Sequence, residues 1–223
     1  MVVDIFEIYE RGLPMTKNKM KKLFATAMAV AMVFVMTSCG SNSNEVPGTY
    51  TPELLDEAKT YYADIDIADY GKITVKLNQA EAPVSCANFV ALAEDGFYNG
   101  LTFHRIMEGF MMQGGDPQGT GMGGSENNIV GEFASNGYEN NISHKRGVIS
   151  MARANDPNSA SSQFFICHVD SEFLDGDYAA FGEVTEGIEV VDAVCEKAQP
   201  TDGNGTIPAE EQPVMTSVTI RVE

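Results

Sequence analysis

Basic residues are scarce in this sequence: 14 Lys and Arg stand against 32 Asp and Glu among 223 residues, for a formal net charge of −18. Nucleic acids bind to basic surfaces, so this shortage argues against nucleic acid as a partner. The four cysteines form no CxxC pair, and the three histidines do not cluster in the sequence. Neither a zinc site nor a disulfide framework is therefore indicated.

The sequence also lacks an apolar run long enough to span a membrane. The run Leu23–Met36 has 14 residues, whereas a spanning helix needs about 20. Lys21 and Lys22 precede it and small residues follow it, which is typical of a secretory signal. Residues 1–38 are thus predicted to be a signal peptide. Residues 1–14, whose acidic side chains do not suit the basic end of a signal, are suspected to precede the true start.

A cysteine directly follows the predicted cleavage site. Residues 36–39 (MTSC) resemble a bacterial lipobox, whose cysteine receives a diacylglyceryl group, although Met36 stands where the pattern prefers leucine. We therefore expect an exported protein, lipid-anchored to the cell membrane through Cys39 and facing the periplasm or the cell exterior. The alternative is an ordinary signal peptide that happens to end before a cysteine. Residues 39–59, polar and rich in turn formers, are predicted to be a flexible tether.

Residues 60–223 have the pattern of one domain made mainly of short strands. A helix is predicted between Pro83 and Gly96, where apolar residues recur at helical spacing. Ile188, Val191 and Val194 share one face of a second predicted helix. Many short strands with two helices favour a closed antiparallel barrel capped by two α-helices. The strand candidates are Tyr61–Ile67, Lys72–Leu77, Leu101–Met107, Phe110–Gln113, Gly147–Met151, Gln163–His168, Ala179–Val184 and Val214–Val222.

Three segments carry a more specific pattern. They are FHRIMEGFMMQGGDPQGTG (residues 103–121), GVISMARANDPNSASSQFFI (147–166) and FLDGDYAAFGEV (173–184). In order and approximate spacing they resemble the signatures of the cyclophilin family of peptidyl-prolyl cis-trans isomerases. The resemblance covers about residues 60–223. It implies a closed eight-stranded barrel and an isomerase that acts on proline-containing polypeptides without cofactor or metal. With the signal peptide, it implies assistance to the folding of exported proteins.

The chemistry of such an isomerase sets simple demands on its site. Rotation about a peptide bond crosses a barrier of about 18–20 kcal/mol, and X-Pro bonds interconvert unaided over about 10–100 s. No covalent bond has to break. The catalyst must hold the proline ring, leave the preceding carbonyl free to swing, and favour a twisted amide with a pyramidal nitrogen. An apolar cup, one fixed cationic donor and a few neutral hydrogen-bonding groups meet these demands.

The resemblance assigns these parts to residues of this chain. Arg105 is expected to donate to the prolyl nitrogen at the transition state, since arginine stays charged and offers a rigid fork of N–H groups. Gln113 is expected to orient Arg105, and Phe110 to form part of the cup. The other substrate-binding residues that the resemblance implies lie in the cup, along the groove and at its rim: Met111, Phe165 and Leu174; Ala152, Arg153 and Gln163; Phe173 and Tyr178.

Three positions depart from the pattern of many eukaryotic members. Phe173 replaces a tryptophan, so cyclosporin-type ligands are expected to bind less well. Tyr178 stands where histidine is often found, which is expected to alter the rim. Arg153 stands where asparagine is frequent. Because the backbone of the Ala152–Arg153 segment is expected to bind the peptide, little loss is expected from this change.

Other functions remain open beside catalysis. The groove could grip proline-containing segments with turnover incidental, or the barrel could be the scaffold of an adhesion lipoprotein. The presence of Arg105, Phe110, Gln113 and Phe165 together favours catalysis, because simple binding has no evident need for an arginine donor. Nothing in the sequence suggests a partner subunit, so a monomer is expected.

The remaining cysteines and one histidine are given structural roles. Cys86, Cys167 and Cys195 fall on predicted helices and a strand and are expected to be buried and inert. His104 is expected to make a structural hydrogen bond, although a metal site built from histidines stays an alternative.

Overall fold

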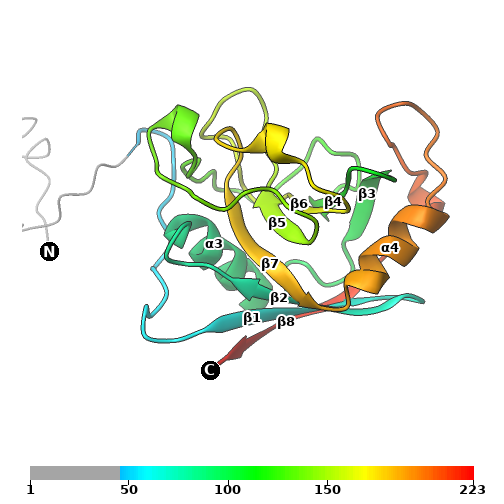
Figure 1. Ribbon diagram of the computed structural model, residues 1–223, viewed down its shortest axis with the longest axis horizontal. Coiled ribbons are helices and arrows are strands. Elements are labelled where there is room, and N and C mark those ends of the chain that lie inside the picture. Colours follow the sequence, from blue (N-terminus) through cyan, green and yellow to red (C-terminus); the bar gives the residue numbers. More distant parts are fainter. Residues whose placement is uncertain (1–45) are drawn as a thin grey trace, which may run out of the picture. The chain divides into compact units, whose positions relative to one another are not determined.

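The computed structural model describes residues 46–223, so the predicted signal peptide and Cys39 lie outside it (Figure 1). Within these residues eight antiparallel strands form one sheet, with helices α3 (Pro83–Glu94) and α4 (Ile188–Lys197) at opposite ends. No helix among residues 46–223 has the length and apolar character needed to cross a bilayer. The strands are β1 (Tyr61–Ile67), β2 (Gly71–Leu77), β3 (Thr102–Met107), β4 (Met111–Asp116), β5 (Val148–Met151), β6 (Phe164–Cys167), β7 (Ala180–Glu186) and β8 (Met215–Val222). These confirm the predicted strands, and their ends differ from the prediction by up to three residues.

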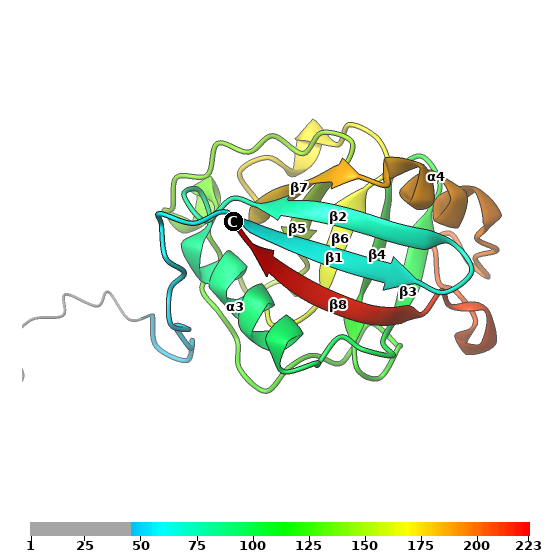
Figure 2. The ribbon, with the colours of Figure 1, turned by 90° about the horizontal axis from the view of Figure 1, so that it is seen from below.

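The sheet is open, so the predicted closed barrel is wrong. Its strand order, β3-β4-β6-β5-β7-β2-β1-β8, leaves β3 and β8 as edges of a half-barrel (Figure 2). The outer edge of β3 is already occupied by the loop before β8, because the Ile106 N–H donates to the Gly205 carbonyl at 2.8 Å. β3 approaches β8 through an isolated bridge between Thr102 and Val214. The loop thus takes the hydrogen bonds that would have joined the two edges.

The core lies inside the half-barrel and is built around Phe89 of α3. Its ring centroid lies 5.0 Å from that of Tyr98, 5.5 Å from Phe164 of β6 and 5.4 Å from Phe181 of β7. Strand alternation directs Phe164 to this cluster and Phe165 to a second one on the opposite face of the sheet. Phe164 therefore belongs to the core, and Phe165 lies on the face that carries the groove.

A buried carboxylate from a distant loop caps α3. Glu132 accepts hydrogen bonds from the Val84 N–H at 2.9 Å, the Ser85 N–H at 2.8 Å and the Ser85 hydroxyl at 2.6 Å. The N-cap residue Ala82 has no side-chain acceptor, so Glu132 accepts from the free N–H groups of the first turn instead. Burial raises the pKa of Glu132, against the three donors that favour the ionised form.

The segment before β1 packs on the domain, which corrects the prediction that all of residues 39–59 form a flexible tether. The Tyr50 N–H donates to the Asn128 carbonyl at 2.7 Å, and Leu55 packs against the core. Pro52 is buried as well. These contacts remove the conformational freedom that a polar, turn-rich composition suggested. The rest of the predicted tether, residues 39–45, lies outside the described part of the chain.

The Glu132 cap generates a stability prediction. We expect Glu132→Ala to lower the free energy of unfolding by about 2–4 kcal/mol, because it leaves three donors at the start of α3 without a partner. Urea unfolding followed by circular dichroism measures the change. Glu94→Ala, at an exposed position of the same helix, is the matched control and is expected to change the value by about 0.5 kcal/mol or less. Equal effects of the two substitutions would contradict the capping role.

Candidate active site

The register of the sheet aligns three groove residues. Arg105 of β3 pairs with Gln113 of β4, and Gln113 pairs in turn with Phe165 of β6. Residues paired across neighbouring strands project to the same face of a sheet. Arg105, Gln113 and Phe165 therefore stand side by side on the face opposite the core.

A small cavity of about 110 Å³ opens at this row. Met111, Phe165 and Leu174 are buried in one apolar cluster, with Phe110 and Tyr178 packed around them. This cluster is the apolar cup expected from the sequence. All nine residues that line the cavity are among the predicted site residues: Arg105, Phe110, Met111, Gln113, Ala152, Arg153, Phe165, Leu174 and Tyr178.

The Arg105 guanidinium is fixed at the edge of the cup. Its Nε donates to the Asn204 carbonyl at 2.7 Å, and its Nη1 donates to Gln113 Oε1 at 3.2 Å. Partial burial lowers the pKa of Arg105, and Tyr178 and Asp202 act in the opposite direction. Arginine nevertheless stays charged in proteins. The cup thus carries one oriented cationic donor.

Gln113 is held in turn by a second glutamine. Gln113 Nε2 donates to Gln163 Oε1 at 2.9 Å, and Gln163 Nε2 donates to the carbonyls of Gly121 at 3.1 Å and Gly123 at 2.7 Å. This chain fixes the side of Gln113 that accepts from Arg105. Gln163 lies outside the cup and lines an adjoining cavity of about 390 Å³, which Gln113, Ala152 and Arg153 also line.

Phe173 is the one predicted groove residue that lines neither cavity. Its side chain is 73% exposed, and its ring centroid lies 5.5 Å from that of Phe110. It therefore extends the apolar rim outside the cup.

One backbone N–H beside the cup has no partner among residues 46–223. The Ala152 N–H donates to the Gln163 carbonyl at 3.0 Å. Residues 46–223 provide no partner for the next N–H, that of Arg153. The Arg153 N–H is therefore available to a ligand in the groove.

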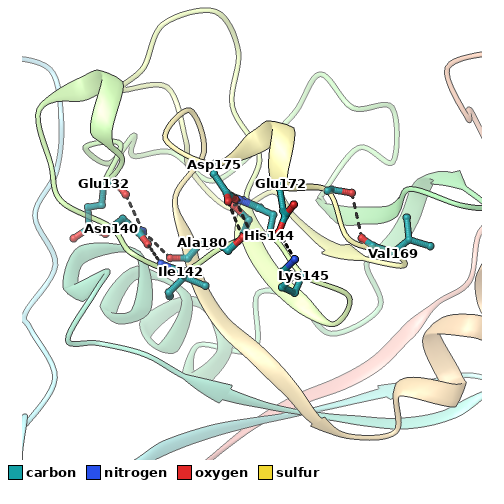
Figure 3. A network of polar contacts seen from close by, with 12 residues as sticks. Glu132, Asn140, Ile142, His144, Lys145, Val169, Glu172, Asp175 and Ala180 are labelled. Carbon is teal, nitrogen blue, oxygen red and sulfur yellow. Dashed lines mark hydrogen bonds and ion pairs between the residues drawn. The ribbon is translucent and has the colours of Figure 1, made fainter.

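A polar network missed by the sequence analysis lies under the cup. His144 Nδ1 lies 2.8 Å from Asp175 Oδ1 (Figure 3). Nε2 lies 3.0 Å from Ser150 Oγ, and the ring stacks on Phe165 with centroids 6.0 Å apart. Because a carboxylate only accepts, Nδ1 carries the proton and Nε2 accepts from the Ser150 hydroxyl. His144 lies in a polar stretch without periodicity, so no pattern indicated this role.

Ser150, His144 and Asp175 are hydrogen-bonded in the same sequence of contacts as a Ser-His-Asp triad. The burial of Ser150 and His144 nevertheless excludes nucleophilic catalysis. In such a triad the serine oxygen must reach the substrate. Ser150 and His144 are both 0% exposed. The network therefore supports Phe165 and the Leu174–Asp175 turn from below.

The expectation that His104 makes a structural hydrogen bond is wrong. His104 is buried, and neither of its ring nitrogens has a hydrogen-bond partner within residues 46–223, so the expected structural hydrogen bond is absent. Burial lowers the pKa of His104, which keeps the ring neutral. Among the described residues no group of three or more His, Cys, Asp or Glu side chains is arranged to hold a metal ion.

Three cysteines are buried as expected. Burial raises the pKa of Cys167 and of Cys195 to about 12, and raises that of Cys86 further. A thiol reacts as its thiolate, so these cysteines are inert at neutral pH.

Comparisons with known proteins agree on one family. Residues 62–221 match the model of the family described as cyclophilin type peptidyl-prolyl cis-trans isomerase. A peptidyl-prolyl cis-trans isomerase of Helicobacter pylori is 46% identical over 148 residues, which are 66% of this chain and 88% of that protein. The human peptidyl-prolyl cis-trans isomerase-like 3 is 44% identical over 125 residues, 56% of this chain and 76% of that protein. A Cryptosporidium parvum cyclophilin, crystallised in the presence of the dipeptide Ala-Pro, superposes with a TM-score of 0.63 at 30% identity, covering 72% of this chain and 98% of that one.

The buried His144 generates a prediction about pH. Burial lowers the pKa of His144 although Asp175 opposes the shift. Below pH 6.5, the ordinary value, the unfolded chain binds a proton that folded His144 does not, so stability falls as pH falls. This slope is at most about 1.4 kcal/mol per pH unit for one group.

We therefore expect the free energy of unfolding to drop more between pH 7.5 and pH 5.5 in the wild type than in His144→Gln. Urea unfolding at both pH values measures the difference. His104 contributes a slope of the same sign in both proteins, so the comparison isolates His144. Equal slopes in the two proteins would show that His144 titrates as in the unfolded chain.

Proposed function

Because the chain belongs to the cyclophilin-type peptidyl-prolyl cis-trans isomerase family, we propose that it catalyses X-Pro rotation in the groove around Arg105 and does so for proteins exported from the cytoplasm. The observation that carries the catalytic assignment is the oriented guanidinium of Arg105 beside an apolar cup. The proposal has two parts, a mechanism and a place of action, and each has its own test.

In the mechanism the proline ring occupies the cup formed by Phe110, Met111, Phe165 and Leu174. These apolar walls hold the ring by van der Waals contact, while the carbonyl before it lies toward the open groove and turns. Holding one side of the bond and freeing the other directs thermal motion into rotation about the C–N bond. No proton transfer and no covalent intermediate is needed.

Arg105 stabilises the twisted state. When the amide twists, its nitrogen loses resonance with the carbonyl and gains a lone pair, which accepts a hydrogen bond from the guanidinium. In the planar ground state this lone pair is delocalised, so the interaction strengthens only as the bond rotates. An interaction gained at the transition state raises the rate. Gln113 and the Asn204 carbonyl keep the donor in place, so little reorganisation is required.

The place of action is inferred from the sequence before the domain. A basic start, a short apolar run and Cys39 behind it favour a lipid anchor on an exported protein. The chain is bonded to the domain from Tyr50 onward, so the stretch from Cys39 to Tyr50 extends at most about 40 Å. An anchor at Cys39 would hold the groove close to the membrane, facing the periplasm or the cell exterior. The protein acts there as a monomer, and exposed Phe173 gives cyclosporin-type ligands a weaker hold than tryptophan.

The catalytic part predicts a large effect of one substitution. We expect Arg105→Ala to lower kcat/KM for a short Ala-Pro peptide by about 100- to 1000-fold, the usual loss on removing a transition-state donor. Exchange spectroscopy of the cis and trans forms by NMR measures the rate. Arg146→Ala, which removes an arginine paired with Asp192 outside the groove, is the control and is expected to stay active. An inactive, folded wild type would leave a proline-binding module instead of an enzyme.

The export part predicts a lipid on Cys39. We expect the full-length chain, expressed in a bacterium, to partition into the detergent phase, and its Cys39→Ser variant to move to the aqueous phase. Mass spectrometry of the N-terminal peptide identifies the modification directly. An unmodified Cys39 at the N-terminus of the secreted protein would support the ordinary signal peptide instead.

A further inference from the structure

We propose that the groove prefers proline-containing segments with an acidic side chain within about two residues of the proline, and that the Arg153 guanidinium binds this carboxylate. The inference rests on the proposed function and names the class of substrate that the same groove selects.

The groove is locally basic on an acidic protein. After removal of residues 1–45, which hold five Lys/Arg and four Asp/Glu, 9 basic and 28 acidic residues remain. Arg105 and Arg153 line the groove, and neither forms an ion pair with a carboxylate of residues 46–223. The described residues place no Asp or Glu in the lining of either cavity. Two unpaired cations thus face the substrate.

The Arg153 side chain is held in a fixed orientation. Its guanidinium carbon lies 5.1 Å from the Phe133 ring centroid and 4.8 Å from that of Tyr178. Nε donates to the Asp177 carbonyl at 3.0 Å, and Nη1 donates to the Ala154 carbonyl at 2.9 Å. Residues 46–223 supply no hydrogen-bond partner for Nη2. A packed guanidinium with a free edge is organised in advance to bind a carboxylate, so little side-chain entropy is lost on binding.

The position of Arg153 relates this free edge to the proline. Arg153 lines both the cup of about 110 Å³ and the adjoining cavity of about 390 Å³. When a proline fills the cup, the next residues of the peptide extend along the larger cavity. An extended chain advances about 3.3–3.6 Å per residue, so a side chain one or two residues away passes the guanidinium. The larger cavity is otherwise lined by neutral side chains and glycines.

The role is more than the backbone contact expected from the sequence. A backbone interaction tolerates many side chains, so the sequence alone predicts little effect of the Arg153 side chain. The structure adds a side chain that connects the rim to the cup, since Tyr178 also packs edge-on against Phe165 with centroids 5.8 Å apart. The guanidinium can therefore both support the rim and select the substrate.

The expected preference is moderate. A partly exposed ion pair is worth about 0.2–1 kcal/mol, which corresponds to a preference of up to about fivefold. The acidic domain also repels anionic peptides at long range, but screening within about 8 Å at 0.15 M salt leaves mainly the close contact. Measurements at that ionic strength therefore report on the local pair.

The test compares end-blocked peptides that differ only in Glu, Gln or Lys at each of the two positions on either side of the proline. The quantity is the kcat/KM ratio of the Glu peptide to the Gln peptide, with Kd ratios from NMR titration as a readout independent of turnover. We expect a ratio of about two to five for the wild type at one or more positions. It should fall to about one in Arg153→Gln, be partly kept in Arg153→Lys, and be unchanged in Lys76→Gln, which removes a cation outside the groove.

Each ratio compares two peptides on one variant, so a general loss of rim structure in Arg153→Gln cancels. A ratio near one in the wild type at every position, a preference for the Lys peptide, or a preference that survives Arg153→Gln would overturn the inference. Activity on the Gln peptide would then still support the isomerase. Loss of turnover on all peptides would instead contradict the proposed function, while the Kd ratios would continue to decide the role of Arg153.

Discussion

The neighbouring strands β4 and β6 direct alternate side chains into the core and into the groove. This arrangement constrains the register of the sheet and, through it, the geometry of the site. Phe164 must reach the aromatic cluster around Phe89, while Phe165 must form the wall of the cup. A slip of one residue in register would exchange the two. The same register aligns Arg105 with Gln113. The core therefore fixes the site geometry, because the sheet cannot bury its apolar face without also placing the guanidinium beside the cup.

Much of this arrangement could be predicted from the sequence, and the reasons differ between parts. Strand alternation and helix end signals predicted the elements, and three family signatures predicted the cup residues. The open edge between β3 and β8 could not be predicted, because it depends on the pairing of Ile106 with Gly205 in a loop without periodicity. The packing of Tyr50 on the domain could not be predicted for a similar reason. It depends on a backbone hydrogen bond to Asn128, and composition does not indicate such a bond.

Side-chain partners from distant segments were also beyond prediction. Glu132 caps α3 from 47 residues away and His144 meets Asp175 from 31 residues away, so neither contact has a local pattern. Both place polar groups inside the fold, where a missing partner is costly. Arg153 illustrates the limit of a resemblance, because the family pattern concerns the backbone at this position. The structure adds the position of the side chain, whose guanidinium lies against the rings of Phe133 and Tyr178.

The occupied edge of β3 affects how the protein can associate with other polypeptides. An unpaired strand edge is a template on which any extended chain can add as a further strand, and such additions start aggregation. An enzyme that handles extended polypeptides meets this hazard with every encounter. Here the loop before β8 already holds the β3 edge through Gly205, and the Met215 N–H at the start of β8 donates to the Leu101 carbonyl. The edge of β3 and the start of β8 therefore offer an extended chain no free template, because their backbone groups already have partners.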